Sequence, residues 1–167
     1  MPARNRRRLF LAALAAPALA SGCGFRLRGP QKMAFATVHV GGVSPYSRFT
    51  AELRRQIEAA GTTRVVSTPD EAEVRLDVLS NERDREILSI AGDGSVREYQ
   101  IDRILVYRIR DQAGNELVPP TRLQTRREYD FDDAQIIAKQ REEALLFEDM
   151  ERDLMQQLVR RLAAVRP

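Results

Sequence analysis

The only thiol in this 167-residue chain belongs to Cys23. An apolar run leads up to it, and two small residues, Ser21 and Gly22, stand directly before it. A thiolate is a strong nucleophile, so this side chain can form a covalent bond that its neighbours cannot form. Because the chain has no second cysteine, no disulfide can form within it. In an exported protein such a cysteine is a free thiol, half of an intermolecular bridge or a modified residue.

Residues 1–22 have the order of a secretory signal. Four arginines lie among the first eight residues, no acidic residue precedes Cys23, and Leu9 to Ala20 contains only Leu, Phe, Ala and one Pro. This apolar run is shorter than the ~20 residues that span a bilayer, so we predict a removable signal. Without those four arginines, 23 basic side chains stand against 24 acidic ones. The remainder is nearly neutral, and we expect no nucleic-acid partner.

The stretch from Leu19 to Cys23, L-A-S-G-C, resembles the lipobox of bacterial lipoproteins. In those proteins the cysteine thiol is acylated, the chain is cut before the cysteine, and the new amine is acylated as well. The resemblance implies a lipoprotein-type signal at 1–22, a covalent lipid on Cys23 and a lipidated tether at 23–32. Gly24 stands where an Asp would indicate retention at the inner membrane, which favours the outer membrane. The alternative to lipidation is a soluble protein that is cut after Ala20 and keeps a spare thiol. The route of export, general or twin-arginine, stays open.

Few other residues have the types or spacing that catalysis or metal binding needs. His39 is the only histidine and lies between two valines in a predicted strand, so we expect a structural or exposed side chain. No Ser-His-Asp set, Cys-His pair or multi-histidine metal site can be assembled from the sequence. Nothing selects a pair of carboxylates for a glycosidase-type reaction. We therefore predict no catalytic residue, no metal and no cofactor apart from the covalent lipid.

Two segments have the three- and four-residue spacing of amphipathic helices. The first begins with Ser44 as N-cap and Pro45 at the first helical position, and it ends at Gly61. The second is capped by Asp132 or Asp133. The expected apolar stripes are Tyr46, Phe49, Leu53, Ile57 and Ala60 in the first helix, and Phe147, Met150, Leu154, Leu158, Leu162 and Val165 in the second.

Alternating apolar and polar residues predict β-strands in the rest of the chain. The expected strands are Met33 to Val40, a short piece from Thr63 to Ser67, Ala72 to Leu79 with a continuation or bulge to Ile90, Val96 to Arg110, and Leu117 to Phe131. Arg103 interrupts the apolar face of one of them. We predict a single α+β domain with a mostly antiparallel sheet of about four strands and both helices packed on one face. The other sheet face is rich in Arg, Glu, Gln and Asp.

Three segments resemble the LPS-assembly lipoprotein family LptE. S-G-C-G-F-R-L-R-G (21–29) resembles the start of its mature members, and V-R-E-Y-Q-I (96–101) resembles a strand that follows a hairpin turn. A-K-Q-R-E-E-A-L-L-F-E-D-M-E-R-D-L-M-Q-Q-L-V-R-R-L (138–162) resembles the terminal helix. The likeness extends along essentially the whole chain after the signal, and it implies an LptE-like α+β domain at 33–167.

The resemblance implies a non-enzymatic role. LptE-like proteins sit at the outer membrane, lipid-anchored and facing the periplasm and a barrel lumen. They plug the LptD β-barrel, assist its assembly and bind lipopolysaccharide during its export to the cell surface. The expected partners are LptD, lipopolysaccharide and, through Cys23, outer-membrane lipid. Two alternatives stay open: an outer-membrane lipoprotein that acts as a periplasmic scaffold for another envelope complex, and a small periplasmic enzyme.

Lipopolysaccharide carries phosphates, so basic side chains should contact it through charge-assisted hydrogen bonds. By the resemblance, Lys139 at the start of the last helix is the expected binding residue. A second basic residue is expected near the first hairpin tip, but here the tip reads A-G-D-G, with Asp93 and no base. The nearest candidate is Arg97. The remaining candidates are Arg103, Arg126 and Arg127.

Overall fold

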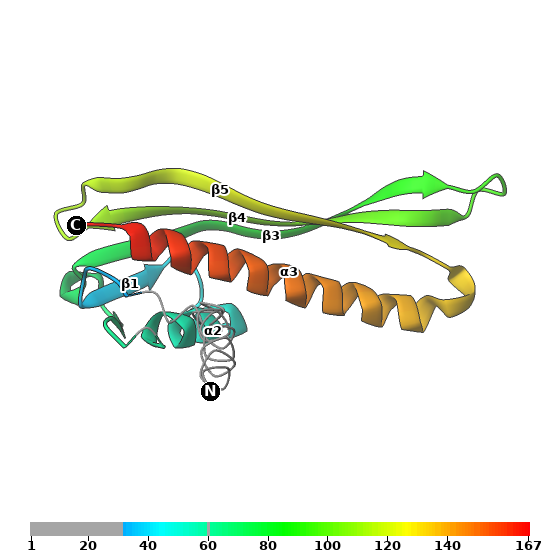
Figure 1. Ribbon diagram of the computed structural model, residues 1–167. Helices are drawn as coiled ribbons and strands as arrows, with labels where there is room; N and C mark the ends of the chain where they lie inside the picture. The colour runs from blue at the N-terminus through cyan, green and yellow to red at the C-terminus, as the bar shows by residue number, and fades with distance from the viewer. Residues whose placement is uncertain (1–31, 60) are drawn as a thin grey trace, which may run out of the picture.

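A computed structural model describes residues 32–59 and 61–167 (Figure 1). Residues 1–31, with the predicted signal, Cys23 and nearly all of the predicted tether, lie outside the described residues. The elements, in chain order, are β1 (Thr37–Gly41), α2 (Arg48–Glu58), β2 (Arg64–Val66), the 3₁₀ turn η2 (Pro69–Glu71), β3 (Val74–Ile90), β4 (Val96–Asp111), β5 (Glu116–Asp130), the 3₁₀ turn η3 (Asp133–Gln135) and α3 (Ile136–Ala164).

The five strands form one mixed sheet in the order β2-β1-β3-β4-β5. β3, β4 and β5 are an antiparallel meander, whereas β1 runs parallel to both of its neighbours. The parallel pairing of β1 with β2 follows from the helix between them, because a crossover returns the chain to the end at which it started. The prediction of about four mostly antiparallel strands is right for the meander. It did not foresee that the short piece near Val65 joins the sheet as a fifth strand.

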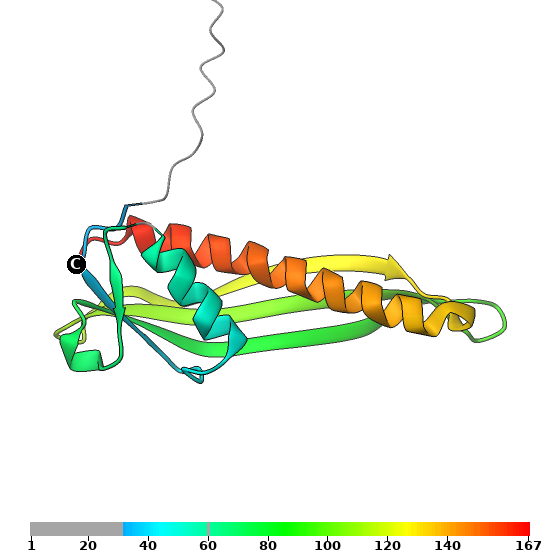
Figure 2. The ribbon, with the colours of Figure 1, turned by 90° about the horizontal axis from the view of Figure 1, so that it is seen from below.

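Both helices cover the same face of the sheet, as predicted (Figures 1 and 2). We call the opposite face the open face. The main core lies between the helices and the inner part of the sheet, at the end where β1 and β2 are. Its fully buried side chains include Leu53 and Ile57 of α2, Leu158 of α3 and Tyr107 of β4. Burial of apolar surface between the sheet and the two helices therefore fixes the positions of both helices.

A bulge in the long strand β3 reverses which alternate residues point toward the helices. Val74, Leu76 and Val78 are buried against the helices. The pairing with β4 then shifts between Val78 and Ser80, so the odd-numbered residues from Asn81 to Ile87 share the helix-covered face. This is the bulge that the sequence left open as an alternative, and the extra residue, Leu79, is 46% exposed.

Helix boundaries differ by a few residues from the predicted ones. α2 begins at Arg48, and its N-cap is Ser47, whose Oγ accepts from the Thr50 amide at 3.1 Å. The predicted cap, Ser44, instead uses its carbonyl to bond the Ser47 amide and the Thr50 hydroxyl. Its turn precedes the helix and leaves Tyr46 96% exposed, outside the predicted apolar stripe.

At the second helix Asp132 is a cap, as predicted, but of the 3₁₀ turn η3. Its carboxylate accepts from the Ala134 amide at 2.9 Å. The regular helix α3 starts at Ile136. At the sheet edge, β5 contains Pro119 and Pro120 near its start. Prolines, which cannot donate to a neighbouring strand, are tolerated in this edge strand.

Candidate functional site

The outer end of the molecule, which we call the tip, brings together three segments that are distant in sequence. The β3–β4 hairpin, the end of β5 and the start of α3 all lie at this end (right side of Figure 1). The Phe131 amide donates to the Arg97 carbonyl at 2.7 Å and ties the end of β5 to the start of β4. A hollow of about 620 Å³ lies here. It is lined by Ser89, Ile90, Arg97, Glu98, Asp130 and Phe131.

Most of the exposed large apolar side chains of the described chain belong to the tip. Ile87 is 53% exposed and Ile90 is 60% exposed on the hairpin, and Ile137 is 60% exposed on the first turn of α3. Leu88 and Ile136 are exposed as well. Exposed apolar side chains that gather in one region mark interaction sites. This feature cannot be predicted from the sequence, because alternation and helical spacing do not show which apolar side chains lack a partner.

The tip also contains two of the five predicted lipopolysaccharide-binding residues. Lys139 lies one turn into α3, where its Nζ is 2.9 Å from Glu142 Oε2 and its side chain is 18% exposed. Arg97 is exposed beside the hollow. Within the described residues, its side chain forms no ion pair with a carboxylate. The tip therefore offers basic groups and apolar side chains together.

The other three predicted residues lie between the tip and the main core. Arg103 is 3% exposed on the helix-covered face, where Nη2 is 2.5 Å from Glu151 Oε2 and Nη1 donates to the Glu82 carbonyl at 2.8 Å. Arg127 on the same face is 3.4 Å from Asp153. Both side chains therefore form part of the contact between the sheet and α3.

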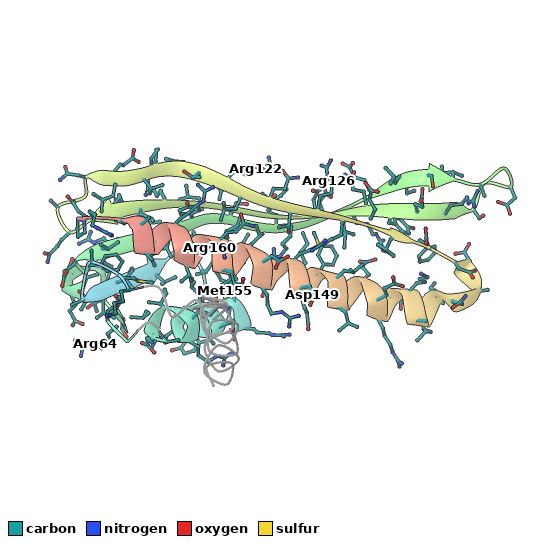
Figure 3. The ribbon with its side chains drawn as sticks, in the orientation of Figure 1. Arg64, Arg122, Arg126, Asp149, Met155 and Arg160 are labelled. Atoms are coloured by element: carbon teal, nitrogen blue, oxygen red, sulfur yellow. The ribbon has the colours of Figure 1, made fainter. Side chains whose placement is uncertain are left out.

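Arg126 lies on the open face, on the side away from α3 (Figure 3). Its Nε is 3.1 Å from Asp102 Oδ1. Burial alone would raise the pKa of Asp102, but hydrogen bonds from Arg126 and Gln124 outweigh it and hold this pKa below its usual value. Arg126 is therefore positioned by a carboxylate of β4.

Near the tip α3 is held to the sheet mainly by a cluster of polar contacts, which the sequence analysis did not find. Arg85 Nη1 is 2.9 Å from Glu143 Oε2, and the Tyr129 hydroxyl donates to the same carboxylate. Burial, and then Glu143, raise the pKa of Tyr129 well above its usual value. A small apolar cluster of Ile101, Tyr129, Phe147 and Met150 supports these contacts. The eight-residue spacing of Glu143 and Glu151 puts both on one side of the helix, but sequence alone does not give their strand partners.

A second hollow, of about 490 Å³, separates α2 from the middle of α3. Acidic and basic residues line this hollow. Arg48 Nη1 of α2 lies 2.9 Å from Glu148 Oε1 of α3. His39 lines a different hollow, beside β2. In residues 32–59 and 61–167, no three His, Cys, Asp or Glu side chains are grouped so that they could hold a metal ion.

The model of one protein family, LptE, described as lipopolysaccharide-assembly, matches residues 35–162. The chain belongs to the LptE family. The LPS-assembly lipoprotein LptE of Pectobacterium atrosepticum is 28% identical over 163 residues, which cover 96% of this chain and 88% of that protein. The LptE of Yersinia enterocolitica is 27% identical over 87% of this chain and 70% of its own length.

Solved structures give the same fold. The solution structure of an uncharacterized lipoprotein B from Nitrosomonas europaea has a TM-score of 0.70 and 28% identity, and the match covers 84% of this chain and 91% of that one. Rare lipoprotein B from Shewanella oneidensis has a TM-score of 0.65 at 20% identity, with 77% and 94% covered. In this LptE-family chain, no helix of the described part is long and apolar enough to cross a membrane.

Proposed function

We propose that this chain is a lipid-anchored, non-enzymatic protein of the outer membrane, facing the periplasm, that binds lipopolysaccharide at the tip and assists and plugs the LptD β-barrel. The ligand assignment rests on one observation: basic side chains and exposed apolar side chains lie together at the tip. Arg97 and Lys139 supply positive charge, and Ile87, Ile90 and Ile137 supply exposed apolar surface. Lipopolysaccharide is an amphiphile with phosphates and acyl chains, and each part matches one of these two kinds of side chain.

The shape and polarity of the domain support the assignment of a barrel partner. At about 3.3 Å per residue, the 15 residues of β5 extend about 50 Å. The open face along this length is composed mainly of charged and amide side chains, with Ile104 and Val106 of β4 among them. The lumen of large membrane barrels is polar, so such a face suits a lumen better than it suits lipid.

Lipid attachment at Cys23 supplies the link to the membrane in this proposal. Cys23 lies outside the described residues, and its role rests on the L-A-S-G-C motif and on the lipoprotein names of the relatives. One acyl chain binds membranes only reversibly, whereas two or more give stable anchoring. Acylation of both the thiol and the new amine meets this requirement.

The ligand assignment is tested by charge reversal at the tip. We expect the double variant Arg97→Asp/Lys139→Asp to bind purified lipopolysaccharide at least about tenfold more weakly, because each charge-assisted hydrogen bond contributes about 1.5–3 kcal/mol. Arg122→Asp is the matched control, since Arg122 is an exposed arginine on the open face, away from the tip. Circular dichroism checks that each variant is folded. Equal affinities of the double variant and the control would refute the tip as the binding site.

A further inference from the structure

Charged side chains on the open face are segregated by sign along the sheet. The cross-strand registers divide them into two groups, which we call the inner rows and the outer rows. The inner rows hold four arginines and two acids: Arg75, Arg108, Arg110, Arg122, Asp77 and Glu116. The outer rows, toward the tip, hold one arginine and seven acids: Arg126, Glu82, Asp84, Glu86, Glu98, Asp102, Glu128 and Asp130. The inner rows are therefore net positive and the outer rows strongly negative.

This arrangement does not stabilise the isolated domain. Asp84 lies directly opposite Asp102, and Glu98 lies directly opposite Asp130. Like charges directly opposite each other in a sheet are destabilising, and freely solvated surfaces normally mix both signs. In the inner rows one carboxylate, Asp77, accepts from both Arg108 and Arg110. A partner surface of the opposite polarity would offset the remaining repulsion.

The length of the face defines the kind of partner. Both groups of rows together extend over most of a sheet whose strands are about 50 Å long. A small ligand cannot contact both ends at once. A phosphate-bearing ligand that lay along the middle of the outer rows would be repelled there, where Glu86 and Glu128 flank Gln100 and no tip cation is nearby. The complementary object is thus an extended polar wall with acidic groups facing the inner rows and basic groups facing the outer rows.

We propose that the open face makes the close polar contact with the inner wall of the barrel, and that the exposed side of α3 faces the water-filled part of the lumen. This inference rests on the proposed barrel partnership and adds its orientation. Figure 3 shows the two sides: Arg122 and Arg126 project from the open face, and Asp149 and Arg160 belong to α3 on the other side of the sheet. The strongest contact is expected at the outer rows, where the excess of one charge is largest.

Site-specific photo-crosslinking in native outer membranes tests the orientation with the full-length protein. A photoreactive amino acid is placed at Arg122 or Glu128 on the open face, and at Asp149 or Arg160 on α3. We expect adducts with a heat-modifiable barrel protein from the first pair, with at least about fivefold lower yield from the second. Equal yields, or adducts from α3 alone, would overturn the orientation and leave the barrel partnership intact. Adducts only between two copies of this chain, or none with any barrel, would overturn both.

A charge reversal supplies an independent readout. Glu128→Lys adds a cation to the outer rows, whereas Asp149→Lys makes the same change of charge on α3, where Asp149 forms an exposed ion pair with Arg152. We expect Glu128→Lys to reduce the amount of barrel protein that co-purifies in low salt at least about fivefold, and Asp149→Lys to change it by less than about twofold. Thermal unfolding of both variants shows that they are folded. Equal recovery of the barrel with both variants would contradict the proposal.

Discussion

At the scale of single residues, Arg103 is the clearest case of a side chain whose role changes between sequence and structure. In the sequence it interrupts the apolar face of β4 and is a candidate for phosphate binding. In the structure it is 3% exposed and bonded to Glu151, a residue 48 positions away on α3. Among the residues that the structure describes, its Nε has no hydrogen-bond partner. The burial of a charge at this point makes the pair sensitive to the loss of either partner.

We predict that Arg103→Met lowers the free energy of unfolding by about 1.5–3 kcal/mol, because the Glu151 carboxylate loses its closest cation and keeps only the longer contact with Arg83 at 3.7 Å. The double variant Arg103→Met/Glu151→Leu should recover most of this loss. Urea unfolding of the wild type, both single variants and the double variant gives the coupling energy. Additive effects of the two substitutions would show that the pair has no special role.

Gly42 is a second residue for which the structure makes a sharp prediction. Its φ is +79°, and a Cβ added here would lie 1.9 Å from the Val78 carbonyl oxygen. We expect Gly42→Ala to cost about 3 kcal/mol or more in urea unfolding, from backbone strain and the clash together. Gly94→Ala is the control, since its φ is +87° with nothing within 4 Å, and it should cost about 1 kcal/mol. Similar losses for both would mean that the clash is relieved by movement of β3.

At the scale of elements, α3 is attached to the sheet in two different ways. Its C-terminal half packs into the main core through residues such as Leu158 and Leu162. Its N-terminal half is held by the ion pair of Glu143 and by the small cluster around Met150, and the ion pair of Glu151 lies at the middle of the helix. Fewer buried apolar contacts mean a lower local opening energy. The tip half of the helix should therefore open independently of the rest.

Amide hydrogen exchange of two variants tests this division. Met150 and Leu158 are both fully buried. We expect Met150→Ala to speed exchange mainly in residues 136–150 and at the end of β5, and Leu158→Ala to speed it throughout the domain, because its loss leaves a cavity in the main core. Identical exchange profiles for the two variants would show that α3 unfolds as one unit.

The sequence predicts local features better than it predicts pairings between distant segments. Helical spacing located both helices, and alternation located the three long strands. The cap at Ser47 was missed because the Ser44 carbonyl builds a preceding turn, which is a tertiary detail of the β1–α2 connection. The parallel pairing of β1, and the arginine–carboxylate pairs that hold α3, depend on contacts between residues far apart in the chain. For the candidate site, Lys139 and Arg97 were named from the family resemblance, but the exposed apolar side chains beside them were not.

At the scale of the whole molecule, the proposed anchor determines where the domain acts. We predict that Cys23→Ser moves most of the protein from the membrane fraction to the soluble periplasmic fraction, because no acyl chain can then be attached. Ser21→Ala, a small-for-small change two residues earlier, should leave the distribution unchanged. Fractionation with mass spectrometry of the purified protein gives both location and acylation. A Cys23→Ser protein that remains in the membrane fraction would show that another attachment is sufficient.

The edge position of β5 has a consequence for the protein before it meets any partner. An unpaired strand edge is a template on which further chains can stack into fibrils. Two consecutive prolines, Pro119 and Pro120, lack amide donors and interrupt the start of this edge as a template. Arginines at 122, 126 and 127 bring like charges together if identical edges approach. Replacing both prolines would leave the fold but expose a longer template. The wild-type edge thus favours solubility before the protein meets a partner.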